Sequence, residues 1–399
     1  MAYAGSAAIA GFSEWKPEQR SRAEARYFTT EQWALLSRQA LDDAGIAPGL
    51  VDGIATAGFP ETSMMAPATV TEYLGIEVGF AEYVDLGGAT SAGMIWRAAA
   101  AIDLGLANVV LCTVPGTPIP ELAQRTEGGR TYLGSLSDAV GSPQAEFEIP
   151  FGNVGQNAAY ALIAQRYGAT YGYDPAALAK IAVDQRFSAQ ANPAAIFCGK
   201  PLTVADVLAS PMIAEPLHML EIVMRCSGGA SVVVARADIA ASGPNRPVAI
   251  KGFGEGVAHR TPSYARDMTV TTMGRAADCA FRMAGLRREE VDMVSVYDCY
   301  TITVLLTLED AGFCKKGEGQ AFVTEHDLTY RGDFPCNTHG GQLSFGQPGI
   351  AGGMSHVCDA VRQLMGRAGA GQVQGAEVAF VAGTGGLMSE QVALVLAAQ

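Results

Sequence analysis

The sequence is poor in charged side chains and in histidine, and these shortages limit what the protein can bind. Only 17% of its 399 residues are charged, and only five are histidine. No stretch approaches the ~20 uninterrupted apolar residues of a membrane span. The formal charge of −13 excludes nucleic acid and anionic membrane surfaces as expected partners, because both carry the same sign of charge.

Patterned cysteines are also absent. The eight cysteines lie far apart and form no Cys-x-x-C pair, which predicts reduced core residues and not a disulfide framework or a zinc site. No Cys/His cluster and no paired carboxylates suggest a metal, so no metal site is expected. The apolar segment from Ala7 to Phe12 is too short for a signal peptide, so a cytoplasmic location is expected.

Apolar residues, in contrast, make up 49% of the chain, which is enough for a large core. A chain of this length should contain about two domains or two fused halves. A weak internal repeat supports the second alternative, because segment 40–52 recurs at 280–292 with the same Ala-Gly and Val-Asp spacing. Segment 91–111 likewise resembles segment 352–380. We therefore expect two similar α/β halves joined near residues 241–247.

The densest run of glycine lies between residues 337 and 353, where six of seventeen residues are glycine. Apolar residues at helical spacing predict a helix directly after it, from Met354 to Met365. A Gly-rich turn that leads into a helix can hold an anion or a polarised carbonyl. A simple packing turn is the commoner role of such a run.

The motif in this run resembles the C-terminal signature of the thiolase superfamily, in its sterol-carrier-protein-type branch. It reads Asn-Thr-x-Gly-Gly-x-Leu-Ser-x-Gly-x-Pro-x-x-Ala-x-Gly. The resemblance implies an α/β thiolase fold with two duplicated βαβαβαββ halves in an α-β-α-β-α layered arrangement. It places the first half at residues 1–243 and the second at 244–399. An insertion in the first half, at about 115–193, would cover the active site and bind coenzyme A.

The sequence departs from the thiolase pattern at each group that runs Claisen chemistry. Thiolases carry a nucleophilic cysteine at the start of a buried helix, but the matching stretch 85–93 has Gly88 or Ala89 there. The family's Gly-His-Pro motif has Gln347 in place of histidine, and the late Cys-x-Gly turn is replaced by segment 381–386, which has no cysteine. Covalent acyl transfer through cysteine is therefore not expected.

A third motif, Tyr297-Asp298-Cys299-Tyr300-Thr301, follows a predicted strand at the position of the family's substrate-facing turn. A tyrosine at a strand end usually packs in the core or at its rim. Together with the missing nucleophile, this motif resembles the thiolase-like aldolases of steroid side-chain degradation. The resemblance implies retro-aldol cleavage of a β-hydroxyacyl-CoA, in which the Tyr297 phenol exchanges a proton with a substrate oxygen. Cys299 is interpreted as a core residue.

Three further residues complete the candidate catalytic set. His339 has an unperturbed pKa suited to proton transfer near neutrality, although a hydrogen bond within its own turn is an equal alternative. Asn337 can orient a water molecule or bond the thioester oxygen. Gln347 takes the place of the family's histidine but cannot accept a proton at neutral pH.

Gly88, Ser344 and Gly385 are the expected contacts of the CoA thioester, with the two glycines supplying backbone N–H groups to an oxyanion. Coenzyme A would enter as part of the substrate, and no permanently bound cofactor is expected. Arg225 and Lys251 are candidates for its phosphates, although nothing in their spacing singles them out.

The resemblance also implies partners and leaves alternatives open. Members of this group form homodimers through the sheet edges of their first halves and commonly pair with a small OB-fold, zinc-ribbon protein of the DUF35 family. One alternative activity is a thiolase-type acyltransferase that uses a distant residue. The other is a non-catalytic subunit that binds CoA esters.

Overall fold

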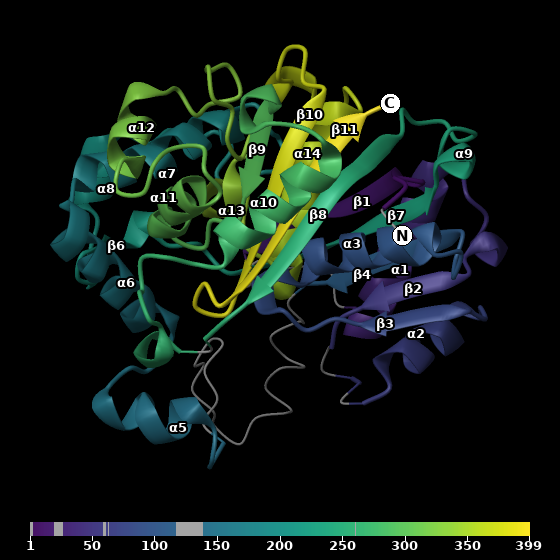
Figure 1. The fold of residues 1–399 in the computed structure, drawn as a ribbon, viewed down its shortest axis with the longest axis horizontal. Helices are drawn as coiled ribbons and strands as arrows, with labels where there is room; N and C mark the ends of the chain where they lie inside the picture. The colour runs from purple at the N-terminus through teal and green to yellow at the C-terminus, as the bar shows by residue number, and fades with distance from the viewer. Residues whose placement is uncertain (1–2, 20–26, 59–60, 63, 117–138, 260) are drawn as a thin grey trace.

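The computed structural model describes residues 3–19, 27–58, 61–62, 64–116, 139–259 and 261–399. Long strands run through its centre, and helices lie on both sides of them (Figure 1). Within these residues, no helix is long and apolar enough to cross a membrane.

Nine strands form one hydrogen-bonded sheet in the order β3-β2-β4-β7-β1-β8-β11-β10-β9. The strands are β1 (Ala7–Gln19), β2 (Gly53–Thr56), β3 (Phe80–Tyr83), β4 (Val109–Pro115), β7 (Cys226–Arg236), β8 (Val248–Val257), β9 (Met293–Val296), β10 (Val378–Gly385) and β11 (Glu390–Ala398).

The strand order is mirrored about the junction between β1 and β8. Moving outward, β1, β7, β4 and β2 on one side correspond to β8, β11, β10 and β9 on the other. On both sides the first two pairings are antiparallel and the last is parallel. β2 and β9 directly follow the repeated segments 40–52 and 280–292, so the internal repeat seen in the sequence is a repeat of structure.

The sheet wraps around two central helices, α3 (Thr90–Asp103) and α14 (Gly352–Leu364). α3 contacts β4 on one flank of the sheet and β10 on the other. Because neighbouring strands lie ~4.8 Å apart, one helix could not reach both flanks of a flat sheet. The apolar inner faces of both halves and the two helices form one continuous core.

Two helices cover the outer faces: α1 (Thr29–Ala44) packs on β1, β7 and β4, and α10 (Met273–Ala284) packs on β8 and β11. α10 buries Met273, Ala276, Ala277, Ala280 and Phe281, the one-sided spacing of an amphipathic helix. α3, whose sequence is mostly small and apolar, is buried on nearly all sides. The layers are therefore α-β-α-β-α, as expected from the sequence.

The first half contains a long excursion between β4 and β7. The predicted insertion 115–193 is its first part, although 117–138 lie outside the described residues. Helix α6 begins within this insertion, at Gln156, and runs to Tyr171. The helices of the excursion are α5 (Pro143–Phe147), α6 (Gln156–Tyr171), α7 (Pro175–Gln190) and α8 (Val204–Ala209), and its strands β5 (Met212–Ala214) and β6 (Leu217–His218) form a small hairpin.

The remaining helices lie elsewhere in the chain. They are α2 (Ala66–Leu74), α9 (Ala237–Ala240), α11 (Thr301–Asp310), α12 (Gly319–Glu325) and α13 (Gly341–Ser344).

The excursion helices pack against the second half. α6 and α7 share a hydrophobic core with α11 and α12, and Figure 1 shows these helices together on the side of the sheet opposite α1 and α2. Three parts of the chain, the two halves and the excursion, are thereby brought around one region at the ends of β9 and β10.

Candidate active site

A cavity of about 580 Å³ lies where the two halves meet the excursion. Its walls come from the turn before α3, the start of α6, the turn after β9, the Gly-rich segment and the β10–β11 turn. The lining residues are Asp85, Gly87, Gly88, Gln156, Tyr160, Arg225, Tyr297, Cys299, Gln347, Gly349, Ile350, Thr384, Gly386 and Glu390.

Three of the predicted site residues, Tyr297, Gln347 and Gly88, meet in this cavity. Tyr297 follows β9 directly, and its backbone N–H donates to the carbonyl of Ala382 on β10 at 2.9 Å. The side-chain amide of Gln347 donates to the Tyr297 phenol oxygen at 3.4 Å. The turn after β9 and the Gly-rich segment thus present their polar groups to the same space.

Gly88 lies against the ring of Tyr297. A β-carbon at position 88 would lie 2.4 Å from Tyr297 Cζ and 2.4 Å from the carbonyl oxygen of Thr384. Real β-carbons do not make such contacts, so any side chain here requires the ring to move. The tyrosine ring therefore fills the space that a side chain at position 88 would need.

The structure does not bring Asn337, Ser344 or Gly385 onto the cavity wall. Both amide atoms of Asn337 are used by the backbone of Val296, which donates to Oδ1 at 2.7 Å and accepts from Nδ2 at 2.9 Å. Ser344 Oγ accepts a hydrogen bond from Arg186 Nε at 2.8 Å. The roles predicted for Asn337 and Ser344 at the thioester are therefore not supported. Gly385 packs its backbone against Leu86, while its two neighbours line the cavity.

His339 was also placed in the active site from the sequence, and its surroundings do not support that role. It is 3% exposed, and its Nδ1 lies 3.1 Å from Asp359 Oδ2 on α14. It lines a separate cavity of about 360 Å³ together with Asp359 and Arg362. His339 therefore belongs to a buried ion pair away from Tyr297.

The His339–Asp359 pair gives a pH-dependent stability. Burial lowers the pKa of His339, but the nearby Asp359 carboxylate outweighs burial and raises it overall. Because the pKa of His339 is raised in the folded state, the His339–Asp359 pair stabilises the fold fully at pH values below the unfolded-state pKa of about 6.5. This stabilisation is lost as the pH rises through the folded-state pKa. We therefore expect His339→Gln to destabilise the protein most near about pH 6 and progressively less towards about pH 9.

Denaturant unfolding across this pH range measures the effect. His326→Gln is the control, because His326 lies at the surface beside Asp333. A stability difference for His339→Gln that does not change with pH would contradict the expectation.

A buried polar network holds the turn that carries Tyr297. Asp298 is fully buried and accepts backbone N–H groups from Gln342 at 2.8 Å and Leu343 at 3.1 Å. His356 on α14 places Nε2 3.0 Å from Asp298 Oδ1. Because a buried carboxylate needs such partners, Asp298 ties the Tyr297 turn to the Gly-rich segment and to α14. His356 was not connected to the site by the sequence.

Cys299, interpreted as a core residue from the sequence, is buried but also lines the cavity. Burial raises the pKa of its thiol to about 12, although hydrogen bonding from Tyr160 opposes the shift. A thiol with this pKa carries its proton at neutral pH and is a poor nucleophile. Cys299 therefore does not replace the missing thiolase cysteine.

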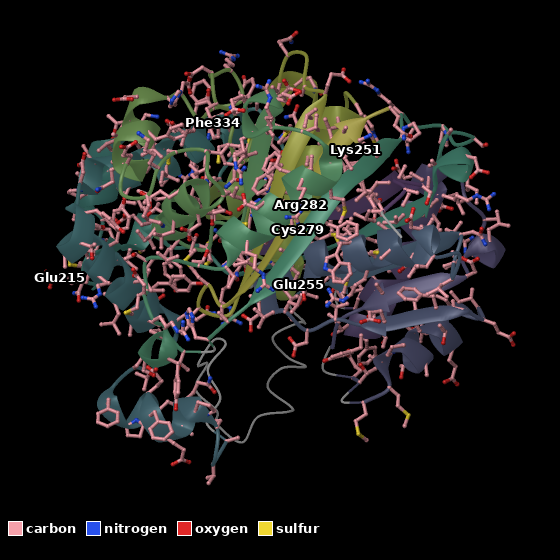
Figure 2. The ribbon with its side chains drawn as sticks, in the orientation of Figure 1. Glu215, Lys251, Glu255, Cys279, Arg282 and Phe334 are labelled. Atoms are coloured by element: carbon pink, nitrogen blue, oxygen red, sulfur yellow. The ribbon has the colours of Figure 1, made fainter. Side chains whose placement is uncertain are left out.

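The two candidates for binding the CoA phosphates, Arg225 and Lys251, lie in different places. Arg225 lines the cavity. Lys251 projects from β8 well away from Glu255 (Figure 2). The cavity lies near the end of β8 that follows Glu255, where Val257 pairs with the cavity residue Glu390, so Lys251 is far from the cavity. In the described part of the chain, no group of three His, Cys, Asp or Glu residues is arranged to hold a metal.

Known proteins resemble this chain over nearly its whole length. A family model described as thiolase C-terminal domain-like matches residues 254–398. A steroid side-chain-cleaving aldolase from Thermomonospora curvata is 32% identical, over 91% of this chain and 91% of its own. A 17-hydroxy-3-oxo-4-pregnene-20-carboxyl-CoA lyase from Mycobacterium tuberculosis is 33% identical, over 87% of this chain and 89% of its own. The solved structure of an Ltp2-ChsH2(DUF35) aldolase matches with a TM-score of 0.85 and 29% identity, covering 99% of this chain and 98% of its own.

These matches confirm both the thiolase fold and the branch that the sequence motifs indicated. The chain belongs to the thiolase superfamily, in the sterol-carrier-protein-type, thiolase-like branch that contains the steroid side-chain-cleaving aldolases.

Proposed function

We propose that this protein cleaves the bond between the α- and β-carbons of a β-hydroxyacyl-CoA in a retro-aldol reaction, without a covalent acyl-enzyme. The chain is a thiolase-like aldolase, a lyase that acts on a thioester. The observation that carries the mechanism is the Tyr297 ring over Gly88. The ring fills the space that a side chain would need at position 88, one of the two positions that match the thiolase cysteine.

The reaction requires three events in the cavity. The β-hydroxyl loses its proton, the α–β bond breaks as the β-carbon becomes a carbonyl, and the bonding electron pair moves to the thioester as an enolate. The enolate α-carbon then takes up a proton, so atoms and charge balance. No step needs a nucleophile or a redox cofactor.

Tyr297 is the residue that we assign to the β-oxygen. Its phenol can donate a hydrogen bond to this oxygen and is itself held by the Gln347 amide at 3.4 Å. The thiol of Cys299, which keeps its proton at neutral pH, supplies the proton for the enolate carbon.

The thioester oxygen is assigned to the N-terminal end of α3, beside Gly87 and Gly88. Backbone N–H groups and the positive end of the helix dipole favour the negative charge of an enolate there. These glycines line the cavity, so a ligand can approach their backbone closely.

Coenzyme A is proposed to enter as part of the substrate, along the excursion. A largely apolar groove of about 430 Å³ adjoins the cavity there, because Asn157 and Met224 of the groove are the chain neighbours of Gln156 and Arg225 of the cavity. The groove suits the pantetheine arm, and Arg225 suits a negatively charged group on the ligand.

Two assemblies are proposed. β3 is the outermost strand of the first half, and its free edge can pair with the same strand of a second copy, which supports a homodimer. The name of the Ltp2-ChsH2(DUF35) aldolase includes a DUF35 protein. Because that structure matches 99% of this chain, the match supports a similar partner here.

Incubation of the protein, with and without a DUF35 partner, with β-hydroxyacyl-CoA thioesters tests the function. We expect a shortened acyl-CoA and a ketone or aldehyde in equal amounts, with deuterium from D₂O at the α-carbon of the thioester. Mass spectrometry should find no acyl-enzyme. An acyl-enzyme would support the acyltransferase alternative, and no cleavage with any partner present would support a non-catalytic subunit; either result rejects the aldol proposal.

A further inference from the structure

The retro-aldol step leaves one group unassigned, the base that accepts the β-hydroxyl proton. Tyr297 is assigned to donate a hydrogen bond to the β-oxygen, so it keeps its own proton and another group must accept the hydroxyl proton. Gln347 has no basic atom. The thiol of Cys299 carries its proton, and His339 is paired with Asp359 outside the cavity.

Among the described residues of the cavity wall, the carboxylates are Asp85 and Glu390. Asp85 is exposed, whereas Glu390 is partly buried at the first position of β11. Glu390 is fixed in the sheet on both sides, because its backbone pairs with Gly385 on β10 and with Val257 on β8. A carboxylate on a paired strand is held more firmly than one in an exposed turn.

Glu390 and Tyr297 line the same cavity. Glu390 Oε2 accepts a hydrogen bond from the hydroxyl of Ser389. A β-carbon at Gly386 would lie 2.5 Å from this Oε2, and one at Gly87 would lie 3.0 Å from the Gly386 nitrogen. Gly386 therefore lies against the carboxylate, and Gly87 lies against Gly386.

We propose that Glu390 is the general base that receives the β-hydroxyl proton. This inference rests on the retro-aldol function proposed above. The O–H bond breaks, the β-carbon–oxygen bond becomes a carbonyl, and the electron pair of the α–β bond moves into the enolate. Glu390 holds the proton while the enolate carbon is protonated, and then returns it to the thiolate left on Cys299. Tyr297 holds the β-oxygen by a hydrogen bond during proton transfer.

The groups around Glu390 allow the pH dependence to be assigned. The titratable and charged groups that face it from the packed elements are Asp85, Tyr160, Arg225, His259, Tyr297 and Cys299. Burial lowers the pKa of His259, with the Glu390 charge opposing the shift, so His259 is largely neutral at neutral pH. If the wild-type protein loses rate at acidic pH and the variant without the Glu390 carboxylate does not, the loss therefore arises from this carboxylate.

Glu390→Gln tests the proposal, because it keeps the shape of the side chain and removes the basic oxygen. We expect kcat for β-hydroxyacyl-CoA cleavage to fall by about 100-fold or more, with little change in KM and with loss of the acidic limb of the pH–rate profile. Glu390→Asp should retain part of the rate and the acidic limb. Glu377→Gln is the matched control, since Glu377 precedes β10 at the opposite end of the same hairpin and pairs with Arg246 at the surface.

Thermal unfolding of each variant separates loss of chemistry from loss of fold. A Glu390→Gln variant that keeps the wild-type kcat and the acidic limb of the pH–rate profile would overturn the assignment. The assignment would also fail if Asp85→Asn lost the acidic limb and Glu390→Gln did not. If the wild-type protein cleaves no β-hydroxyacyl-CoA, the proposed function itself fails, which is a different result.

Discussion

Replacing Gly88 by cysteine is expected to reduce carbon–carbon cleavage by about 100-fold or more, because displacement of a reacting group by ~1 Å has an effect of this size. The variant should not gain thiolase activity, although thiolases carry their nucleophile in this turn. A β-carbon at position 88 would lie 2.4 and 2.5 Å from two ring atoms of Tyr297, so the ring must leave its position. Position 88 can accommodate either a nucleophile or the Tyr297 ring, but not both.

Steady-state cleavage of a β-hydroxyacyl-CoA and mass spectrometry for an acyl-enzyme measure this effect. Gly49→Cys is the matched control, because a β-carbon there meets no atom within 4 Å. Overpacking costs about 1–3 kcal/mol, so Gly88→Ala serves as a milder variant if the cysteine variant is poorly folded. A folded Gly88→Cys protein that keeps wild-type cleavage would disprove the coupling between Gly88 and Tyr297.

The second large effect is expected for Tyr297→Phe. The ring stays against Gly88, so the fold should be preserved, and the cost of the unpaired Gln347 amide should be about 1 kcal/mol. The phenol hydroxyl is lost, and with it the hydrogen bond that holds the β-oxygen during proton transfer. We expect kcat to fall by about 10²- to 10³-fold, the usual effect of removing one hydrogen-bond donor that stabilises a charged oxygen in the transition state.

Tyr300→Phe is the control for this variant. Tyr300 belongs to the same turn, but its hydroxyl donates to Asn157 Oδ1 at 2.6 Å and the residue does not line the cavity. Its removal should lower the stability by about 1 kcal/mol and leave kcat within a few-fold of wild type. Cleavage by Tyr297→Phe at the wild-type rate would show that the phenol has no part in proton transfer.

Three residues chosen from sequence motifs line one cavity because local structure fixes their positions. Tyr297 follows a short apolar strand, and Gln347 and Gly88 lie in glycine-rich turns next to the two central helices. Each turn leads into a helix whose position is set by the duplicated fold. Tyr297, Gln347 and Gly88 therefore face the junction of the two halves.

The predictions for Asn337 and His339 were wrong in placement for a reason that the sequence does not contain. Asn337 has φ of 55°, in the left-handed region, and its amide completes the hydrogen bonding of Val296. The chain turns there, so His339 contacts Asp359 on α14 and does not line the Tyr297 cavity. Side-chain direction in such a turn depends on backbone dihedrals and on partners more than 20 positions away.

The sequence analysis did not choose Glu390 or Cys299, the two residues that we add as proposed proton acceptor and proton donor. Glu390 begins an ordinary apolar strand, and nothing near it forms a motif. It reaches the cavity only because β11 pairs with β10 and the turn between them lies against Gly87. Only the folded sheet shows that these residues line one cavity.

The sequence by itself determined the architecture and showed that the usual thiolase cysteines and the Gly-His-Pro histidine are missing. Both depend on residue types at fixed spacing, namely the repeated segments, the glycine-rich turns, and the glycine and glutamine where a cysteine and a histidine would be needed. The tertiary structure decided which polar groups share the cavity, because this depends on strand pairing and turn direction. It also supplied the physical reason for Gly88: the ring of Tyr297, more than 200 positions away in the chain, fills the space that a side chain would need there.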